Sequence, residues 1–173
     1  MILIISGTNR PKSKTLKIAQ YYQKQLKKSG ENCQILPLTD LPADVIVSDL
    51  YGQRSDEFQK IQQLVSDADK FIFITPEYNG SIPGVLKIFI DACSFPISFY
   101  HKKAALVGIS SGRYGNLRGI DHLTGICNYL RMHVLPLKIF LPQIQNEINE
   151  EYTFIHDETI RAIDEQIEEL IHF

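Results

Sequence analysis

A short polar segment near the start of the chain carries the kinds of side chain that bind phosphate in proteins. Residues 7–15 begin with Gly7, follow the apolar residues 2–5, and lead into a helix-like pattern. Hydroxyl groups, cations and free amides at a helix N-terminus stabilise a phosphate monoester, which carries about −1.5 to −2 charge at neutral pH. The segment therefore predicts a phosphate site, with a capped helix start and a solvated basic loop as the alternative. The candidate ligands are Thr8, Arg10, Lys12, Ser13, Lys14 and Thr15.

This loop lacks the two glycine motifs that bind nucleotide phosphates. Gly7 has no glycine two residues later, so the GxGxxG motif that holds a pyrophosphate is absent. No GxxxxGK followed by Ser or Thr occurs in the chain either, which argues against hydrolysis of ATP or GTP.

Two further loops follow apolar runs and carry groups suited to a ligand. Residues 110–118 follow the run 104–109 and contain glycines, which allow a ligand close to the backbone. Each loop alone is equally compatible with a helix-entry turn or ordinary surface charge. Because the carboxyl ends of parallel strands meet at one edge of a sheet, the loops are expected to form one site. The loop that follows the run 71–75 comprises Pro76, Glu77, Tyr78, Asn79 and Gly80. Its tyrosine could pack on a flat ring, and its amide side chain could bond the carbonyls of that ring.

Strand-like and helix-like segments alternate along the chain. This alternation is needed if the three loops are to lie at one edge of a sheet. Short apolar runs predict strands, and apolar residues at helical spacing predict helices. Five strands alternating with helices predict a parallel sheet covered on both faces, in either the flavodoxin-like or the classical dinucleotide-binding order. The predicted strands are 2–5, 33–38, 71–75, 104–109 and 134–140, the last somewhat interrupted by Pro136. The predicted helices are 16–28, 55–66, 85–92, 117–131 and 157–171, and residues 43–55 predict an irregular loop or a short helix.

Length and composition predict one ordinary globular domain spanning residues 1–173. The chain is 44% hydrophobic and 22% charged, and its net charge of −2 gives no reason to expect nucleic acid or a membrane as a partner. No apolar run approaches the ~20 residues needed to cross a bilayer, and the apolar start lacks a basic leader. Three widely spaced cysteines predict neither a disulfide framework nor a metal site, so a cytoplasmic protein without a metal centre is expected.

Three motifs resemble those of the NADPH-dependent FMN reductase family. Residues 7–15 are similar to its GSxRxxSxN phosphate loop, with threonine in place of the serine and of the asparagine. Residues 76–87 are very close to its PEYNxSxPGxLK signature, and residues 112–118 resemble its GxxGGxR loop, with Asn116 in place of a glycine. The resemblance covers about residues 1–140.

The resemblance implies a flavodoxin-like three-layer α/β/α sandwich whose five-stranded parallel sheet has the order 2-1-3-4-5. It also implies bound FMN that is reduced by NADPH or NADH in a ping-pong reaction. The acceptor would be a small molecule such as a quinone, a free flavin, an azo compound or a metal oxyanion. No protein nucleophile or general base is expected, because hydride transfer takes place at flavin N5. The implied FMN ligands are Thr8, Arg10, Ser13 and Thr15 for the phosphate, and Pro76, Glu77, Tyr78, Asn79, Ser110, Gly112 and Gly115 for the isoalloxazine.

A homodimer or homotetramer is also implied, with the apolar segment 95–100 as a candidate contact. The chain departs from the family at Ala92, where tryptophan is usual, and it contains no tryptophan. Two alternatives to a reductase are a flavin-binding electron carrier or redox sensor, and a protein that binds another phosphorylated ligand. The net charge of −2 favours the reductase, because carriers of the flavodoxin type are strongly acidic.

Overall fold

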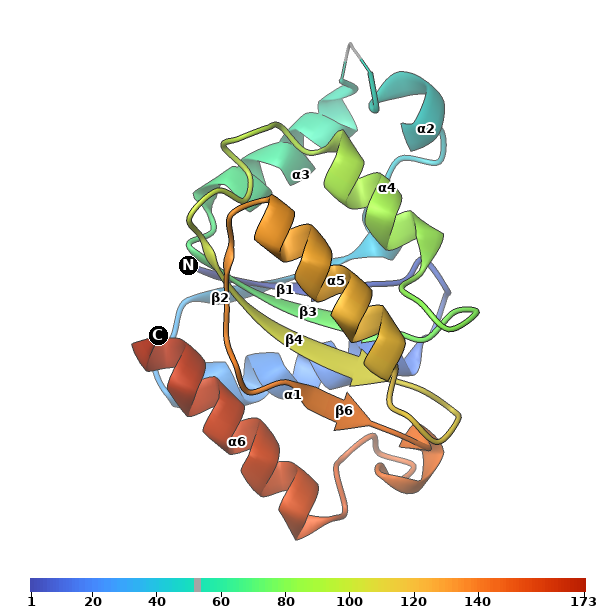
Figure 1. Ribbon diagram of the computed structural model, residues 1–173, viewed down its shortest axis with the longest axis vertical. Helices are drawn as coiled ribbons and strands as arrows, with labels where there is room; N and C mark the ends of the chain where they lie inside the picture. The colour runs from blue at the N-terminus through green and yellow to red at the C-terminus, as the bar shows by residue number, and fades with distance from the viewer. Residues whose placement is uncertain (52–53) are drawn as a thin grey trace.

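A computed structural model describes residues 1–51 and 54–173, in which strands and helices alternate (Figure 1). Residues 52–53, part of the segment predicted as an irregular loop or short helix, lie outside the described residues. The strands are β1 (Ile2–Ser6), β2 (Cys33–Pro37), β3 (Lys70–Pro76), β4 (Lys103–Ile109), β5 (His133–Val134) and β6 (Ile139–Leu141). The helices are α1 (Lys14–Lys28), α2 (Val45–Ser48), α3 (Asp56–Asp67), α4 (Gly84–Ala92), α5 (Leu117–Tyr129) and α6 (Asp157–His172), with short 3₁₀ turns η1 (Leu38–Asp40) and η2 (Ile144–Asn146).

The sheet has the strand order β2-β1-β3-β4-β5, which confirms the flavodoxin-like arrangement, and every pairing is parallel. The fifth strand, predicted over residues 134–140 with an interruption at Pro136, is divided into two strands in the structure. The chain pairs with β4 in two short stretches, β5 and β6, because Pro136 interrupts the run and has no N–H to donate. The same strand position is therefore filled by two pieces separated by four residues, 135–138.

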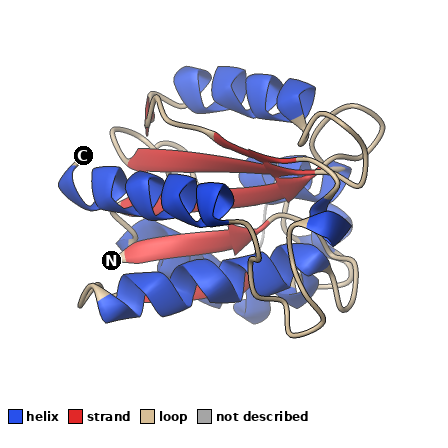
Figure 2. Ribbon diagram, turned by 90° about the horizontal axis from the view of Figure 1, so that it is seen from below, coloured by secondary structure: helices blue, strands red, loops and turns tan. Residues whose placement is uncertain are grey.

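The two faces of the sheet bury different residues of the same strands, since side chains alternate along a strand. In β1, Leu3 and Ile5 pack into the core beneath α3, α4 and α5. Ile2 and Ile4 pack into the core beneath α1 and α6. Figure 2 shows the resulting three layers, with the sheet between two layers of helices. A strand buried on both faces must be apolar throughout, which explains the unbroken apolar runs in the sequence.

The topology brings the loops after β1, β3 and β4 to one edge. Ser6 at the end of β1 pairs with Ile74, and Pro76 at the end of β3 pairs with Ile109 at the end of β4. After β1 the chain forms β2 on one side of β1, and it then returns to form β3 on the other side of β1. The loops after β1 and β3 therefore diverge at their strand ends, which is where open α/β sheets bind ligands.

Three lysines near the opposite edge bind the ends of helices. The Lys70 ammonium donates to the carbonyls of Leu170 (2.9 Å) and Ile171 (2.7 Å), in the last turn of α6. Lys102 donates in the same way to the last turn of α3. Lys103 donates to the carbonyl of Phe173. Cations at these ends satisfy carbonyls that have no partner within the helix and offset the negative end of the helix dipole.

Within the described ranges, no helix combines the length and the apolar character that spanning a bilayer requires.

We expect Gly108→Ala to lower the free energy of unfolding by about 1–3 kcal/mol, because β4 has no room for a methyl group here. A Cβ at Gly108 would overlap the carbonyl oxygen of Gly115 and lie 2.8 Å from Cγ1 of Ile120. Urea denaturation of the variant measures the loss. The control is Gly84→Ala, where a Cβ meets nothing within 4 Å and where the change should stay within about 0.5 kcal/mol. Equal stabilities for the two variants would show that the third loop does not pack against β4 in this way.

Candidate functional site

A cavity of about 570 Å³ lies at the carboxyl edge of the sheet, among the loops that follow β1, β3 and β4. Its volume falls within the roughly 300–1,000 Å³ typical of small-molecule sites. The structure brings nine of the thirteen predicted site residues together around it and leaves out Asn79, Gly80, Gly112 and Gly115. The nine are Thr8, Arg10, Ser13, Lys14, Thr15, Pro76, Glu77, Tyr78 and Ser110.

The loop after β1 presents hydrogen-bond donors at the N-terminus of α1. Ser13 is the N-cap, and its Oγ accepts a hydrogen bond from the Leu16 amide at 3.3 Å. Because its oxygen serves as the acceptor, the hydroxyl hydrogen stays free to donate toward the cavity. The first turn of α1 contains no acidic residue and begins with Lys14. Unpaired amides, hydroxyls and cations therefore meet at the positive end of a helix, which favours an anion.

A hydrogen bond across the cavity joins the first loop to the second. The Oγ of Thr8 and the hydroxyl of Tyr78 are 2.9 Å apart, and the Arg10 amide donates to the same Oγ at 3.2 Å. Thr8 is buried, while 38% of Tyr78 remains exposed. The Glu77 amide donates to the carbonyl of Ile109 (2.8 Å), which fixes the second loop against β4. Tyr78 is thus held at its hydroxyl, which leaves the rest of its ring to form a wall of the cavity.

Asn79 and Gly80 form the turn beyond this wall and do not line the cavity. The backbones of Tyr78 and Ser81 bond each other in both directions, at 3.0 and 3.1 Å. The two residues between them have φ of +53° and +73°. A two-residue turn with positive φ at both positions favours Asn-Gly above other pairs. The structure therefore assigns this Asn-Gly pair to the geometry of a turn.

The third loop is held by a serine hydroxyl inside it. Ser110 Oγ donates to the carbonyl of Gly112 (2.9 Å) and accepts from the amide of Gly115 (3.0 Å). Gly115 has a φ of +57°, and a Cβ there would lie 2.8 Å from the amide nitrogen of Leu141. The glycine therefore allows this loop to pack against β6. Ser111, which is adjacent to Ser110, also lines the cavity.

Asn116 ties the third loop to β3. Its side chain is fully buried, its Nδ2 donates to the carbonyl of Thr75 at 3.1 Å, and its φ is +65°. Its Oδ1 is buried without a hydrogen-bond partner in the described residues. A glycine would fit this left-handed conformation, but it would not make the cross-link to β3.

Six residues that line the cavity are outside the thirteen predicted site residues: Pro11, Lys12, Ile109, Ser111, Ile144 and Tyr152. The first four lie in or directly before the predicted loops, whereas Ile144 and Tyr152 lie far from them in the sequence. Ile144 and Tyr152 come from the segment between β6 and α6, which carries no recognisable binding motif. Their position depends on the path of the chain after β6, where η2 turns back toward the cavity. The amide of Ile144 donates to the carbonyl of Ser110 (3.0 Å), which anchors that segment to the third loop.

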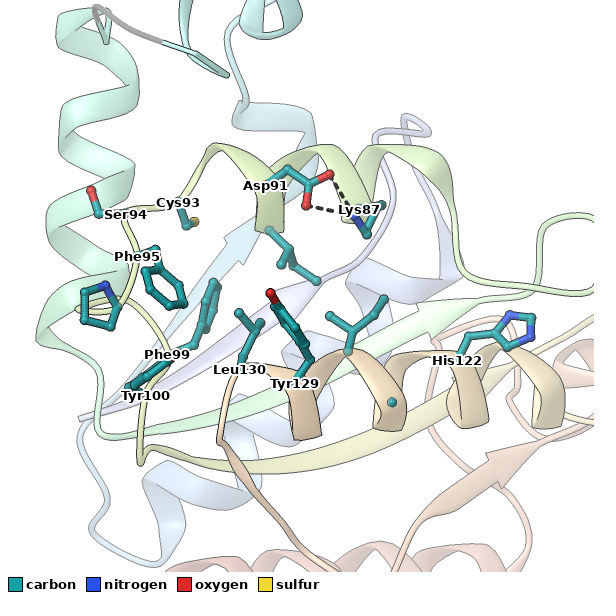
Figure 3. A pocket seen from close by; sticks show the side chains of 14 residues that line it. Lys87, Asp91, Cys93, Ser94, Phe95, Phe99, Tyr100, His122, Tyr129 and Leu130 are labelled. Carbon is teal, nitrogen blue, oxygen red and sulfur yellow. Dashed lines mark hydrogen bonds and ion pairs between the residues drawn. The ribbon is translucent and has the colours of Figure 1, made fainter.

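A second cavity, of about 560 Å³, lies between α4 and α5 and has a mainly apolar lining (Figure 3). We call it the α4–α5 groove. Figure 3 shows Tyr129 extending from α5 toward α4, with Phe95, Phe99 and Tyr100 around one end of the groove. An ion pair between Lys87 and Asp91 (2.8 Å) lies along α4. Neither Gly84 nor Leu117, the first residues of α4 and α5, lines the groove, and the Lys87 ammonium is paired with Asp91, so the groove does not suit a phosphate.

The cysteines are unsuited to nucleophilic chemistry. Burial raises the pKa of Cys93 to about 12, and burial likewise raises the pKa of Cys127 to about 12. Burial also raises the pKa of Cys33. Because the thiolate is the reactive form, the raised pKa values favour the less reactive protonated form of these thiols at neutral pH. In the described ranges, no three His, Cys, Asp or Glu residues are grouped so that they could hold a metal ion.

Comparison with known proteins places these features in a family. The sequence model described as NADPH-dependent FMN reductase matches residues 1–146. An NAD(P)H-dependent FMN reductase of Pseudomonas aeruginosa is 33% identical over 115 residues, which are 65% of this chain and 62% of that protein. A 2-hydroxy-1,4-benzoquinone reductase of a Burkholderia species is 39% identical over 89 residues, which are 47% of this chain and 49% of that protein. The chain thus spans about half to three-fifths of the length of these two relatives.

Solved structures share the fold at low sequence identity. The flavoenzyme NAD(P)H:acceptor oxidoreductase FerB of Paracoccus denitrificans superposes with a TM-score of 0.81. It is 19% identical, and the superposition covers 99% of this chain and 94% of that one.

Proposed function

Because the chain belongs to the NADPH-dependent FMN reductase family, we propose that it is an FMN-dependent oxidoreductase that uses NADPH or NADH to reduce small-molecule acceptors. One observation carries the proposal: a single cavity is lined both by the loop at the start of α1 and by residues 76–78 after β3. A ligand with a phosphate at one end and a flat ring at the other matches both walls, and FMN is such a ligand.

The donor set of the cavity fits FMN. Ser13 has a hydroxyl hydrogen free to donate, and Thr15 is a second hydroxyl at the helix start. Arg10 and Lys14 supply two positive charges to offset a phosphate of about −1.5 to −2. Charge-assisted hydrogen bonds are roughly twice as strong as neutral ones, so the phosphate end would supply much of the affinity.

The opposite end of the cavity would hold the ring. Pro76, Glu77 and Tyr78 would lie along one side of it, and the third loop at Ser110 and Ser111 along another. Asn79, Gly80, Gly112 and Gly115 would act through the shape of these loops, since none of them lines the cavity. We therefore assign the ring contacts to Pro76, Glu77 and Tyr78 and to the third-loop serines Ser110 and Ser111.

When bound, FMN supplies the transfer of electrons between the nicotinamide and the acceptor. The residues of the chain bind and orient it: the N-terminus of α1 fixes the phosphate, and the Thr8–Tyr78 hydrogen bond fixes the wall beside the ring. The nicotinamide and the acceptor would use the same exposed side in turn, which gives ping-pong kinetics. Quinones are the acceptor class that we favour, because the Burkholderia relative is a benzoquinone reductase.

We further propose that a second copy of the chain covers the α4–α5 groove. Phe95 and Tyr129 on its rim are 67% and 81% exposed, and a contiguous apolar surface of this kind marks an interaction site. His122, which also lines the groove, has Nδ1 2.8 Å from Oγ of Ser81 at the turn beyond the cavity wall. A partner in the groove would therefore lie close to the ring end of the cavity.

The absorption spectrum of the purified protein tests the function. We expect a yellow protein, or one that becomes yellow with stoichiometric FMN, and we expect anaerobic NADPH or NADH to bleach it. Reoxidation by a benzoquinone in a second step would support the acceptor class. A protein that binds no FMN would refute the flavin proposal, and bound FMN that neither nucleotide reduces would favour an electron carrier.

The phosphate contact is tested by Arg10→Ala. We expect the dissociation constant of FMN to rise about tenfold, because a charge-assisted hydrogen bond to the phosphate is lost. The constant for riboflavin, which has no phosphate, should stay nearly the same. Fluorescence titration measures both constants, and Arg161→Ala, an exposed arginine on α6, is the control. Equal weakening for the two ligands would mean that Arg10 does not contact the phosphate.

The second copy is tested by Tyr129→Asp. We expect the substitution to weaken self-association by at least about 2 kcal/mol, because a carboxylate would be buried in an apolar contact without a partner. Sedimentation velocity measures the change. Val47→Asp, at a residue that is 89% exposed on α2, should leave the association intact. A wild-type protein that stays monomeric, or a Tyr129→Asp variant that still associates fully, would contradict the proposal.

A further inference from the structure

The segment between β6 and α6 contains a small hairpin, residues 147–155, which lies beyond the part of the chain that the family model matches. Ile148 and Phe154 form an antiparallel bridge, and the Ile155 amide donates to the carbonyl of Glu147 at 3.0 Å. Asn149 closes the tip, since its Oδ1 accepts from the Thr153 amide at 2.9 Å. The hairpin is therefore a hydrogen-bonded element, and its tip carries Tyr152.

The hairpin is anchored along the side of α1. Phe154 is buried and packs edge-on against the ring of Tyr21, with centroids 4.9 Å apart. One turn closer to the start of the helix, the ammonium of Lys17 lies 5.1 Å from the ring centroid of Tyr152. Lys17 is one turn from Lys14, which lines the cavity. These contacts place the Tyr152 ring at the end of the cavity formed by the first turn of α1.

Tyr152 is held in this position by an unusual backbone conformation. Its φ is +57°, in the left-handed region that tyrosine seldom adopts. Its amide donates to the carbonyl of Asn149 (2.9 Å), and 40% of the residue remains exposed. The ring lines the same cavity as Arg10 and the N-terminus of α1.

We propose that Tyr152 is a specificity-determining residue that closes the phosphate end of the cavity and thereby selects FMN against FAD. The inference rests on the proposed function. FAD is FMN extended at its phosphate by an adenosine monophosphate, so an FAD bound in the same way needs an open path beyond the first turn of α1. The Tyr152 ring lies at that end.

Charge alone would not make this selection. Arg10, Lys14 and Lys17 lie near the first turn of α1 and would attract the two phosphates of FAD as well as the one of FMN. A steric barrier against the larger ligand is therefore needed for discrimination, and specificity is commonly built from such clashes. Glu150 and Glu151, both exposed, precede the ring and add negative charge on the hairpin, which further disfavours a second phosphate.

The test compares the dissociation constants of FMN and FAD by isothermal titration calorimetry on the full chain after removal of bound flavin. We expect the wild type to prefer FMN. We expect Tyr152→Ala to reduce the ratio of the FAD constant to the FMN constant by at least about tenfold. Tyr152→Phe keeps the ring and should keep the ratio. Tyr152→Asn removes the ring but suits a positive φ, so it should behave as the alanine variant does even if alanine strains the turn.

Tyr51→Ala is the matched control, because this tyrosine is 94% exposed and does not line the cavity. It should leave both constants unchanged. A wild type with no preference for FMN, or folded Tyr152→Ala and Tyr152→Asn variants with an unchanged ratio, would overturn the role of Tyr152 and leave the proposed function standing. A wild type that binds neither flavin would overturn the proposed function itself.

Discussion

The site depends on the close approach of β1 and β3 at Gly7. Its amide donates to the carbonyl of Ile74 (2.8 Å), and a Cβ at this position would lie 2.9 Å from that same oxygen. A side chain here would push the loop after β1 away from β3. The bond between Thr8 and Tyr78, one residue further along, requires that the two loops stay close. Glycine at this point therefore sets the spacing between the phosphate-binding loop and the wall formed by residues 76–78.

Burial of the strands on both faces of the sheet explains why local sequence patterns predicted most of the fold. Strands buried on both faces must be apolar throughout, so β1, β3 and β4 stand out in the sequence. The run 134–140 was predicted as one strand interrupted at Pro136, and the interruption divides it into β5 and β6, because a proline removes a ladder hydrogen bond. The carboxyl-edge rule correctly gathered three loops, but it did not say which of their residues face inward. Asn79 and Gly115 carry positive φ for turns and packing, and a binding motif looks the same whether a residue touches the ligand or shapes the loop. The position of the Tyr152 hairpin could not be predicted from the sequence, because it depends on tertiary contacts with α1.

The cationic start of α1 carries an electrostatic cost that a ligand would offset. Lys14 occupies the first turn of a helix, where the dipole disfavours a cation by about 0.3–1 kcal/mol, and no acidic residue in that turn compensates. Arg10 is exposed close by. Like charges held together in this way favour the state in which an anion is bound. A bound anion would thus neutralise the positive charges of Arg10 and Lys14 at the cavity. At the other edge of the sheet, the ammonium groups of Lys70, Lys102 and Lys103 donate to carbonyls at the ends of helices.

The buried thiols acquire a meaning beyond packing once the proposed acceptors are considered. Quinones are electrophiles, and they alkylate thiolates by conjugate addition. Cys93 lines the α4–α5 groove, and burial raises its pKa to about 12, which keeps it protonated. Cys127 is protected in the same way on α5. A catalyst that handles electrophiles at every turnover would therefore be chemically durable, because burial keeps its own sulfur atoms from becoming targets of its substrates.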